Sequence, residues 1–165
     1  MTKENIDKIF ILFLCPGNTC RSPMAAAITK HQLGDGYICE SAGINEKIDE
    51  YVAENAIQAL EELECGIILN AKTRKVSAGL IEKADLIFCI NNNALNQMKE
   101  AFPEHVKKFL RYAPDLEGTP DPYDLQHFDL EEKTKYESKT IEAYKFVAAM
   151  MRDIYTPEAI ARLKD

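Results

Sequence analysis

IFILFLCPGNTCRS, the stretch from residue 9 to residue 22, contains the strongest structural signal in the chain. Its first six residues form a near-continuous apolar run, which is typical of a strand buried on both faces of a parallel sheet. Proline, glycine and asparagine follow Cys15, so the strand is expected to end in a loop. Ser22 can cap a helix that has Pro23 at its first position, where the missing proline N–H costs nothing. The stretch therefore predicts a strand, a short loop and a helix.

The rest of the chain alternates short apolar runs with segments of helical spacing. Further strands are expected at residues 37–39, 86–90 and 106–112, and helices over 23–33, 52–63, 92–102 and 141–155. This alternation predicts an α/β fold with a single-domain, four-stranded parallel sheet and helices on both faces. One domain is expected over residues 1–165, with a charged insertion at about 125–139 before the last helix. Ligands bind such sheets beyond the carboxyl ends of the strands, which points to residues 15–22.

Composition narrows the class of protein. The 165 residues are 46% hydrophobic and 28% charged, which is typical of a globular domain. Lys and Arg number 20 against 27 Asp and Glu, giving a net charge of −7, so no basic surface for nucleic acid is expected. The longest apolar run is too short to span a membrane, and the acidic start is a poor signal peptide. Five cysteines fit a reducing compartment. We therefore expect a cytoplasmic protein without nucleic-acid or membrane partners.

Cys15 and Arg21 are separated by five residues, with Ser22 directly after the arginine. A loop of this length can turn its backbone N–H groups inward around an anion, and the following helix adds its positive dipole end. The same field stabilises a thiolate, so Cys15 is predicted to be a nucleophile. Arg21 can hold two oxygens of a phosphoryl group, and Ser22 can donate its hydroxyl to the thiolate. Gly17 and Asn18 are residue types that tolerate the positive φ angle expected in a tight loop.

These residues carry a resemblance to the low-molecular-weight protein tyrosine phosphatase family. The chain shares with it the apolar strand, the loop CPGNTCRSPMA at 15–25, and three shorter motifs at 41–43, 84–87 and 121–123. The resemblance implies a phosphocysteine intermediate, with Asp121 of the Asp-Pro-Tyr motif as general acid and base. Tyr123 would form an aromatic wall beside the phosphate. On composition alone, Asp115, Asp124 and Asp129 are rivals of Asp121.

The same resemblance assigns supporting roles. Ser41 and Arg74 would support the pocket from behind, and Asn18 would hold the loop in shape. The phosphate-binding loop is expected to comprise the residues after the nucleophile, namely Gly17, Asn18, Thr19, Cys20, Arg21 and Ser22. No metal or other cofactor is implied, since the loop supplies the positive charge and no Cys/His spacing resembles a zinc site.

Several positions depart from the family pattern. Pro16 removes one backbone donor from the loop. Ala71 stands where the family has a histidine bonded to the loop asparagine, which questions how rigidly Asn18 is held. Asn91 stands where phosphotyrosine enzymes commonly carry an aspartate. The 125–139 insertion is either a substrate-recognition loop or, as expected for such a charged segment, a solvated surface feature.

Three activities are compatible with the loop. Hydrolysis of phosphotyrosine in a protein or peptide is favoured by Tyr123. Hydrolysis of phosphoarginine is the alternative, because arginine phosphatases of the family carry Thr at the position of Thr19. A thiol-dependent arsenate reductase would need two further cysteines after the third strand, where Asn91 occupies the first position. Oxyanions such as phosphate and sulfate are expected to inhibit.

Cysteines outside the nucleophile are predicted to have separate roles. Cys20 lies five residues from Cys15 across a curled loop, so a regulatory disulfide between them is a further hypothesis. Cys39 and Cys65 are expected to be structural. Cys89 lies within an apolar strand, where a buried inert thiol is the expectation.

Overall fold

A four-stranded parallel sheet forms the middle layer of the molecule, in the strand order β2-β1-β3-β4. The computed structural model describes residues 8–19, 21–46, 48, 50–89, 92–111 and 141–164. The strands are β1 (Ile9–Cys15), β2 (Tyr37–Gly43), β3 (Leu86–Cys89) and β4 (Phe109–Arg111). The predicted fold class is confirmed.

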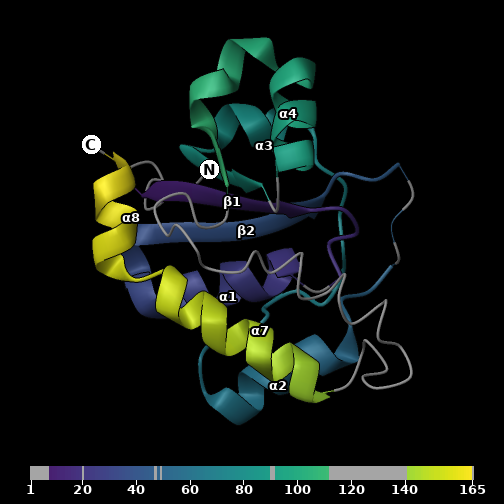
Figure 1. Ribbon diagram of the computed structural model, residues 1–165, viewed down its shortest axis with the longest axis vertical. Coiled ribbons are helices and arrows are strands. Elements are labelled where there is room, and N and C mark those ends of the chain that lie inside the picture. The colour runs from purple at the N-terminus through teal and green to yellow at the C-terminus, as the bar shows by residue number, and fades with distance from the viewer. Residues whose placement is uncertain are drawn as a thin grey trace.

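Helices cover both faces of the sheet (Figure 1). One face carries α1 (Arg21–Leu33), against which α2 (Glu54–Leu63) and α7 (Ile141–Ile154) pack. The other face carries α3 (Ala78–Lys83) and α4 (Asn92–Ala101). In the described part of the chain, the remaining helices are α8 (Pro157–Lys164) and two 3₁₀ helices, η2 (Gly34–Gly36) and η3 (Pro103–Lys108). Within the described ranges, no helix is both long and apolar enough to cross a membrane.

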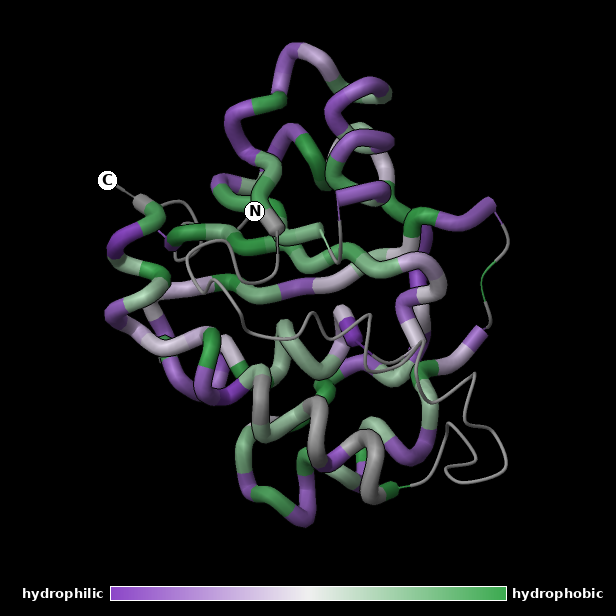
Figure 2. Tube along the Cα trace, in the orientation of Figure 1, coloured by the Kyte–Doolittle hydropathy of each residue, from purple (hydrophilic) through white to green (hydrophobic). Residues whose placement is uncertain are grey.

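Strand β1 is deeply buried, because it pairs with a strand on each side and has helices on both faces. Residues 11–14 are fully inaccessible to solvent, and β1 is hydrophobic along its length in Figure 2. Phe13 stacks on Phe88 of β3 with ring centroids 5.2 Å apart, and Tyr155 meets both rings edge-on. This aromatic cluster ties the C-terminal helices to the sheet.

Helix α1 is buried over its first nine residues, Arg21 to Thr29, because the sheet lies on one side and α2 and α7 on the other. Such a helix is apolar around most of its circumference, so its sequence shows little amphipathic contrast. The two helices that pack on α1 are linked by an ion pair of 2.8 Å between Lys145 of α7 and Glu62 of α2. The hydrogen bonds from Lys145 and Gln58 hold the pKa of the exposed Glu62 carboxyl below its usual range.

The structure corrects several sequence-based expectations. The second strand does not end at 39 but continues to Gly43, because it stays paired with β1 as far as Cys15. The fourth strand begins at Phe109 rather than 106, because Pro103 starts a 3₁₀ helix that runs to Lys108. Helix α1 begins at Arg21, so Ser22 lies in its first turn and is not the N-cap that the Ser-Pro pair suggested. The short helices α3 and α8 were not expected; six and eight residues are too few for a clear periodic pattern.

Gly66 provides a test of how closely the segment after α2 packs on α1. We expect Gly66→Ala to lower the free energy of unfolding by about 2–4 kcal/mol. An added Cβ would lie 2.7 Å from the Ala27 carbonyl oxygen, and the Gly66 φ angle of +149° strains an L side chain. Gly36→Ala is the matched control, because nothing lies within 4 Å of its added Cβ. Urea unfolding followed by circular dichroism measures both, and equal losses would contradict the close packing.

Candidate active site

The candidate site lies at the carboxyl end of β1, where the chain turns into α1. Strands β2 and β3 flank β1, and the helices that follow β1 and β3, α1 and α4, lie on opposite faces of the sheet. Ligands of doubly wound sheets bind at this point, since the loops diverge there and leave space. The structure thus places Cys15 at the position that the strand order alone selects for a ligand.

The Cys15 sulfur receives contacts from two directions. Its Sγ lies 2.9 Å from the Ser22 hydroxyl oxygen, and the backbone N–H of Asn18 donates to it over 3.2 Å. The Ser22 oxygen accepts from the Asn18 side-chain amide at 2.9 Å, which leaves the hydroxyl hydrogen to point at the sulfur. With 2% of its surface exposed, Cys15 lies at the floor of the loop. The two donors can stabilise a thiolate there.

Asn18 fixes the shape of the loop. Its φ angle is +55°, in the left-handed region that asparagine tolerates, and its side chain is 1% exposed. The amide nitrogen donates to Ser22 and to Ser41 at 2.9 Å each, while the amide oxygen accepts from the backbone N–H of Arg74 at 3.0 Å. These three bonds hold the Asn18 side chain in place although Ala71 stands where a histidine was expected.

Backbone carbonyls of the loop accept from amides outside it. The Ile44 amide donates to the carbonyls of Cys15 and Pro16, and the Asn45 amide donates to that of Pro16 at 2.9 Å. Farther along, the Thr19 carbonyl accepts from the amide that precedes α2, at 2.7 Å. Hydrogen bonds from neighbouring segments therefore hold the loop at Cys15, Pro16 and Thr19.

Gly43 allows this close approach and was not singled out as a loop support from the sequence. A Cβ at Gly43 would lie 3.1 Å from the Pro16 carbonyl oxygen and 3.2 Å from the Asn18 Cβ. The position lies within the 41–43 motif, so the motif held a signal for it. Gly17, in contrast, does not have the positive φ that was expected of it; of the two loop residues only Asn18 does.

The two arginines near the site have different surroundings. Arg21 opens α1 and is 7% exposed, so its charge lies close to the positive end of the helix dipole. The Arg74 guanidinium lies at the edge of β2, where it donates to the Ser41 carbonyl at 3.0 Å and pairs with Glu40 at 2.7 Å. Arg74 supports the loop through its backbone amide, whereas the role of Arg21 as an anion ligand stays a prediction.

Several predicted site residues fall outside the described part of the chain. These are Cys20, Asn91, Asp121, Tyr123, the rival carboxylates and the 125–139 insertion. Their roles stay predictions. Among the described residues, no group of three or more His, Cys, Asp or Glu side chains is arranged to hold a metal ion.

Three other cysteines have environments that oppose ionisation. Burial raises the pKa of the Cys39 thiol to about 12, with the neighbouring Lys30 charge opposing it. Burial raises the pKa of Cys89 to about 12 as well, and that of Cys65 above its ordinary value. A thiol with so high a pKa is almost fully protonated at pH 7 and is a poor nucleophile.

A cysteine at the floor of an anion-binding loop, at the switch point of a doubly wound sheet, defines a class of thiol-based phosphate-binding α/β domains. The chain belongs to the low molecular weight phosphotyrosine protein phosphatase family, whose model matches residues 10–153. The resemblance found in the sequence is confirmed.

Similar proteins have more than one activity. A curated relative, arsenate reductase 1 of Bacillus cereus, is 37% identical over 102 residues, which make up 62% of this chain and 72% of that protein. The YwlE arginine phosphatase of Geobacillus stearothermophilus superposes with a TM-score of 0.70 at 24% identity, over 93% of this chain and 91% of its own. The tyrosine phosphatase Wzb of Escherichia coli K30, in complex with sulphate, gives 0.72 at 23% identity, over 93% and 97%. At these identities, the two structures show the shared fold.

The hydrogen bond between Ser22 and Cys15 predicts a rate effect. Ser22→Ala is expected to slow alkylation of Cys15 by iodoacetamide at pH 7 by roughly 10- to 100-fold, the effect of losing a hydrogen bond to a charged group. Ser77→Ala is the matched control, since that hydroxyl caps α3 and is bonded to Leu80 rather than to a thiol. Mass spectrometry of the Cys15 peptide gives the rate. Equal rates in the two variants would exclude the proposed donor.

The raised pKa values of Cys39 and Cys89 predict selective labelling. At pH 7 the folded protein should be alkylated at Cys15 while Cys39 and Cys89 stay unmodified, because burial keeps both as thiols. Urea should make both reactive by restoring ordinary solvation. Peptide mapping before and after unfolding measures this. Labelling of Cys39 or Cys89 as fast as Cys15 in the folded state would contradict it.

Proposed function

We propose that the protein is a cysteine-dependent, metal-independent phosphatase that hydrolyses phosphotyrosine in proteins or peptides. The observation that carries the proposal is the Cys15 sulfur at the floor of the loop, contacted by the Ser22 hydroxyl and the Asn18 amide. Family membership supports a phosphatase. The loop amides, Arg21 and the start of α1 supply positive charge where a phosphoryl group would bind, so the reaction needs no metal ion for charge stabilisation.

The mechanism has two steps. The Cys15 sulfur attacks phosphorus, an S–P bond forms, and the bond from phosphorus to the tyrosine oxygen breaks. Asp121 gives its proton to the leaving phenolate. Asp121 then takes a proton from water as the water attacks phosphorus, and the S–P bond breaks to release inorganic phosphate and the thiolate. Asp121 and the Tyr123 wall enter from the sequence resemblance.

Surroundings of the other cysteines favour hydrolysis over arsenate reduction. Reduction by thiols passes electrons through a relay of disulfides, which requires reactive second and third cysteines. Cys39, Cys65 and Cys89 all have a raised pKa caused by burial. The chain has no cysteine after Cys89, and Asn91 stands at the first expected relay position.

Phosphoarginine is the second candidate substrate, and Thr19 is the residue that favours it. Thr19 is partly exposed, and its Oγ1 lies 3.6 Å from the position of a Cβ added at Gly17. Its hydroxyl is thus close to the loop backbone, where a polar side chain can contact a substrate or an attacking water.

Free phosphate and sulfate are proposed to inhibit the enzyme. The cytoplasm is proposed as its compartment.

Hydrolysis of matched phosphotyrosine and phosphoarginine peptides tests the function and the substrate together. We expect the phosphotyrosine peptide to be hydrolysed faster, and Cys15→Ser to lower kcat by at least roughly 10³-fold, since the nucleophile is lost. A faster phosphoarginine reaction that Thr19→Ile reverses would assign the specificity to Thr19. Rapid Cys15 alkylation without turnover of either peptide would overturn the phosphatase proposal.

The general acid can be identified by single substitutions of the rival carboxylates. Asp121→Asn is expected to lower kcat by roughly 10²- to 10⁴-fold and to remove the limb of the pH profile that reports the acid. Asp115→Asn, Asp124→Asn and Asp129→Asn are matched controls that should stay close to the parent. A comparable loss in one of these controls, with Asp121→Asn active, would move the role to that residue.

A further inference from the structure

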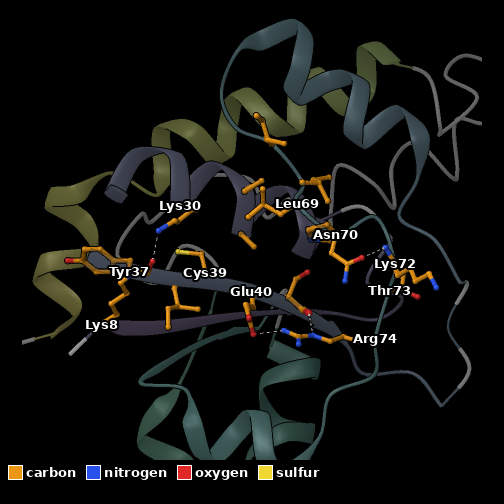
Figure 3. Close-up of a pocket in the computed structure, with 17 residues that line it drawn as sticks. Lys8, Lys30, Tyr37, Cys39, Glu40, Leu69, Asn70, Lys72, Thr73 and Arg74 are labelled. Atoms are coloured by element: carbon orange, nitrogen blue, oxygen red, sulfur yellow. Dashed lines mark hydrogen bonds and ion pairs between the residues drawn. The ribbon is translucent and has the colours of Figure 1, made fainter. Parts of the chain in front are cut away.

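A cavity borders Ser41 and Arg74, two of the residues that support the catalytic loop. It encloses about 360 Å³ between α1, the outer edge of β2 and residues 67–74 (Figure 3). This volume is in the range of small-molecule sites. Cys15, Ser22 and Arg21 are not among its lining residues, so the cavity is separate from the catalytic loop.

The charge of this cavity is opposite to that of the whole chain. Four cations, Lys8, Lys30, Lys72 and Arg74, line it with a single carboxylate, that of Glu40. The chain as a whole carries a net charge of −7. Arg74 pairs with Glu40, and Lys30 donates to backbone carbonyls at both ends of η2. Among the described residues, the Lys8 and Lys72 ammonium groups have no hydrogen-bond or ion-pair partner, so they are available to an anion.

An apolar surface adjoins these cations. Ile67 is 72% exposed and Leu69 is 89% exposed, and both line the cavity with the small side chains of α1. Together they are two of the four large hydrophobic residues exposed in the described part of the chain. An apolar ligand body against them would remove this surface from water.

On the outer edge of β2, which lines the cavity, a few backbone groups lack the hydrogen bonds that a neighbouring strand would provide. The backbone N–H and C=O of Gly43 bond to residues 74 and 76, on the side of β2 away from β1. Because the backbone groups of every second residue face the same edge of a strand, those of Cys39 and Ser41 face this outer edge as well. Arg74 covers the Ser41 carbonyl and Lys30 covers the Tyr37 carbonyl, which leaves the N–H and C=O of Cys39 and the N–H of Ser41 facing outward. A stretch of edge this short does not accommodate an added strand, which favours a small molecule over a peptide.

Two lining residues connect the cavity to the catalytic loop. The Ser41 hydroxyl and the Arg74 backbone amide both bond to the Asn18 side chain, which in turn donates to Ser22 and, through its backbone N–H, to the Cys15 sulfur. A ligand that contacts Ser41 or Arg74 is therefore two hydrogen bonds from the nucleophile.

We propose that this cavity is a regulatory site for a small amphiphilic anion, with a carboxylate-sized head on an unbranched apolar body. The head binds Lys72, the body covers Ile67 and Leu69, and occupancy of this segment changes the reactivity of Cys15 through the Arg74 backbone amide and Asn18. The inference that an anion binds here is based on the cavity alone. The inference that this anion regulates an enzyme rests on the proposed phosphatase function.

Calorimetric titration with decanoate tests binding, with excess inorganic phosphate present to occupy the catalytic loop. Decanoate should bind, whereas decanamide and decylamine, of the same length, should bind at least about threefold more weakly. Lys72→Gln and Leu69→Ser should each weaken decanoate binding by about threefold or more, while their controls Lys107→Gln and Val106→Ser should not. Equal affinity in Lys72→Gln and Lys107→Gln, or complete displacement by phosphate, would overturn the site.

Alkylation of Cys15 tests the coupling without relying on phosphatase activity. Decanoate should change the rate of iodoacetamide alkylation at pH 7 by about twofold or more. Asn18→Ala should keep decanoate binding, which also shows that the variant folds, but lose this response. An unchanged rate at saturating decanoate would overturn the coupling. Because neither measurement requires turnover, a protein that binds decanoate but hydrolyses no phosphopeptide would refute the proposed function and leave the cavity site standing.

Discussion

The side chain of Asn18 is the interaction on which the arrangement of the site depends. One amide group joins the turn after β1 to the start of α1 close by in the sequence, and to the β2 edge and residue 74, which are far from it in the sequence. The amide can do so because it both donates and accepts, and because asparagine tolerates the left-handed backbone at this position. Its burial excludes water that would compete for these bonds.

Much of the fold follows from local sequence signals. The apolar run at 9–15 and the Pro-Gly-Asn that follows it specify β1 and its end, and burial on both faces leaves no ambiguity about which side chains point inward. The start of β4 could not be obtained in this way, since Val106 has a strand-like side chain but follows a proline that begins a 3₁₀ helix. Sequence patterns reflect side-chain types, whereas the start of β4 is determined by the backbone of the 3₁₀ helix that Pro103 begins.

The candidate site was predictable to a different extent. Cys15, Arg21 and Ser22 are close in the sequence, so their spacing indicated a common loop. The contacts of Ser41 and Arg74 with Asn18 join residues 23 and 56 positions apart, and only the family resemblance pointed to them. Gly43 shows what spacing alone does not give. Its lack of a side chain matters only because Pro16 and Asn18 lie against it in the fold.

The likeness to arsenate reductases and to phosphatases is consistent with one scaffold that hosts different chemistry. Phosphate and arsenate are both tetrahedral oxyanions, so a single loop of amides can hold either. What separates the reactions is the availability of further thiols and of an acid, and these depend on other segments. In this chain, burial protects three of the remaining cysteines from ionising.

The outward hydrogen bonds of the loop carbonyls also determine which ions the loop repels. The carbonyl oxygens of Cys15, Pro16 and Thr19 are engaged by amides of the surrounding segments, so the negative ends of these peptide dipoles face the protein. A hydrated divalent cation that entered the loop would find these three carbonyl oxygens already engaged and would meet the buried Arg21 charge. The orientation of these peptide dipoles thus makes the loop an unfavourable place for a cation, whatever its size.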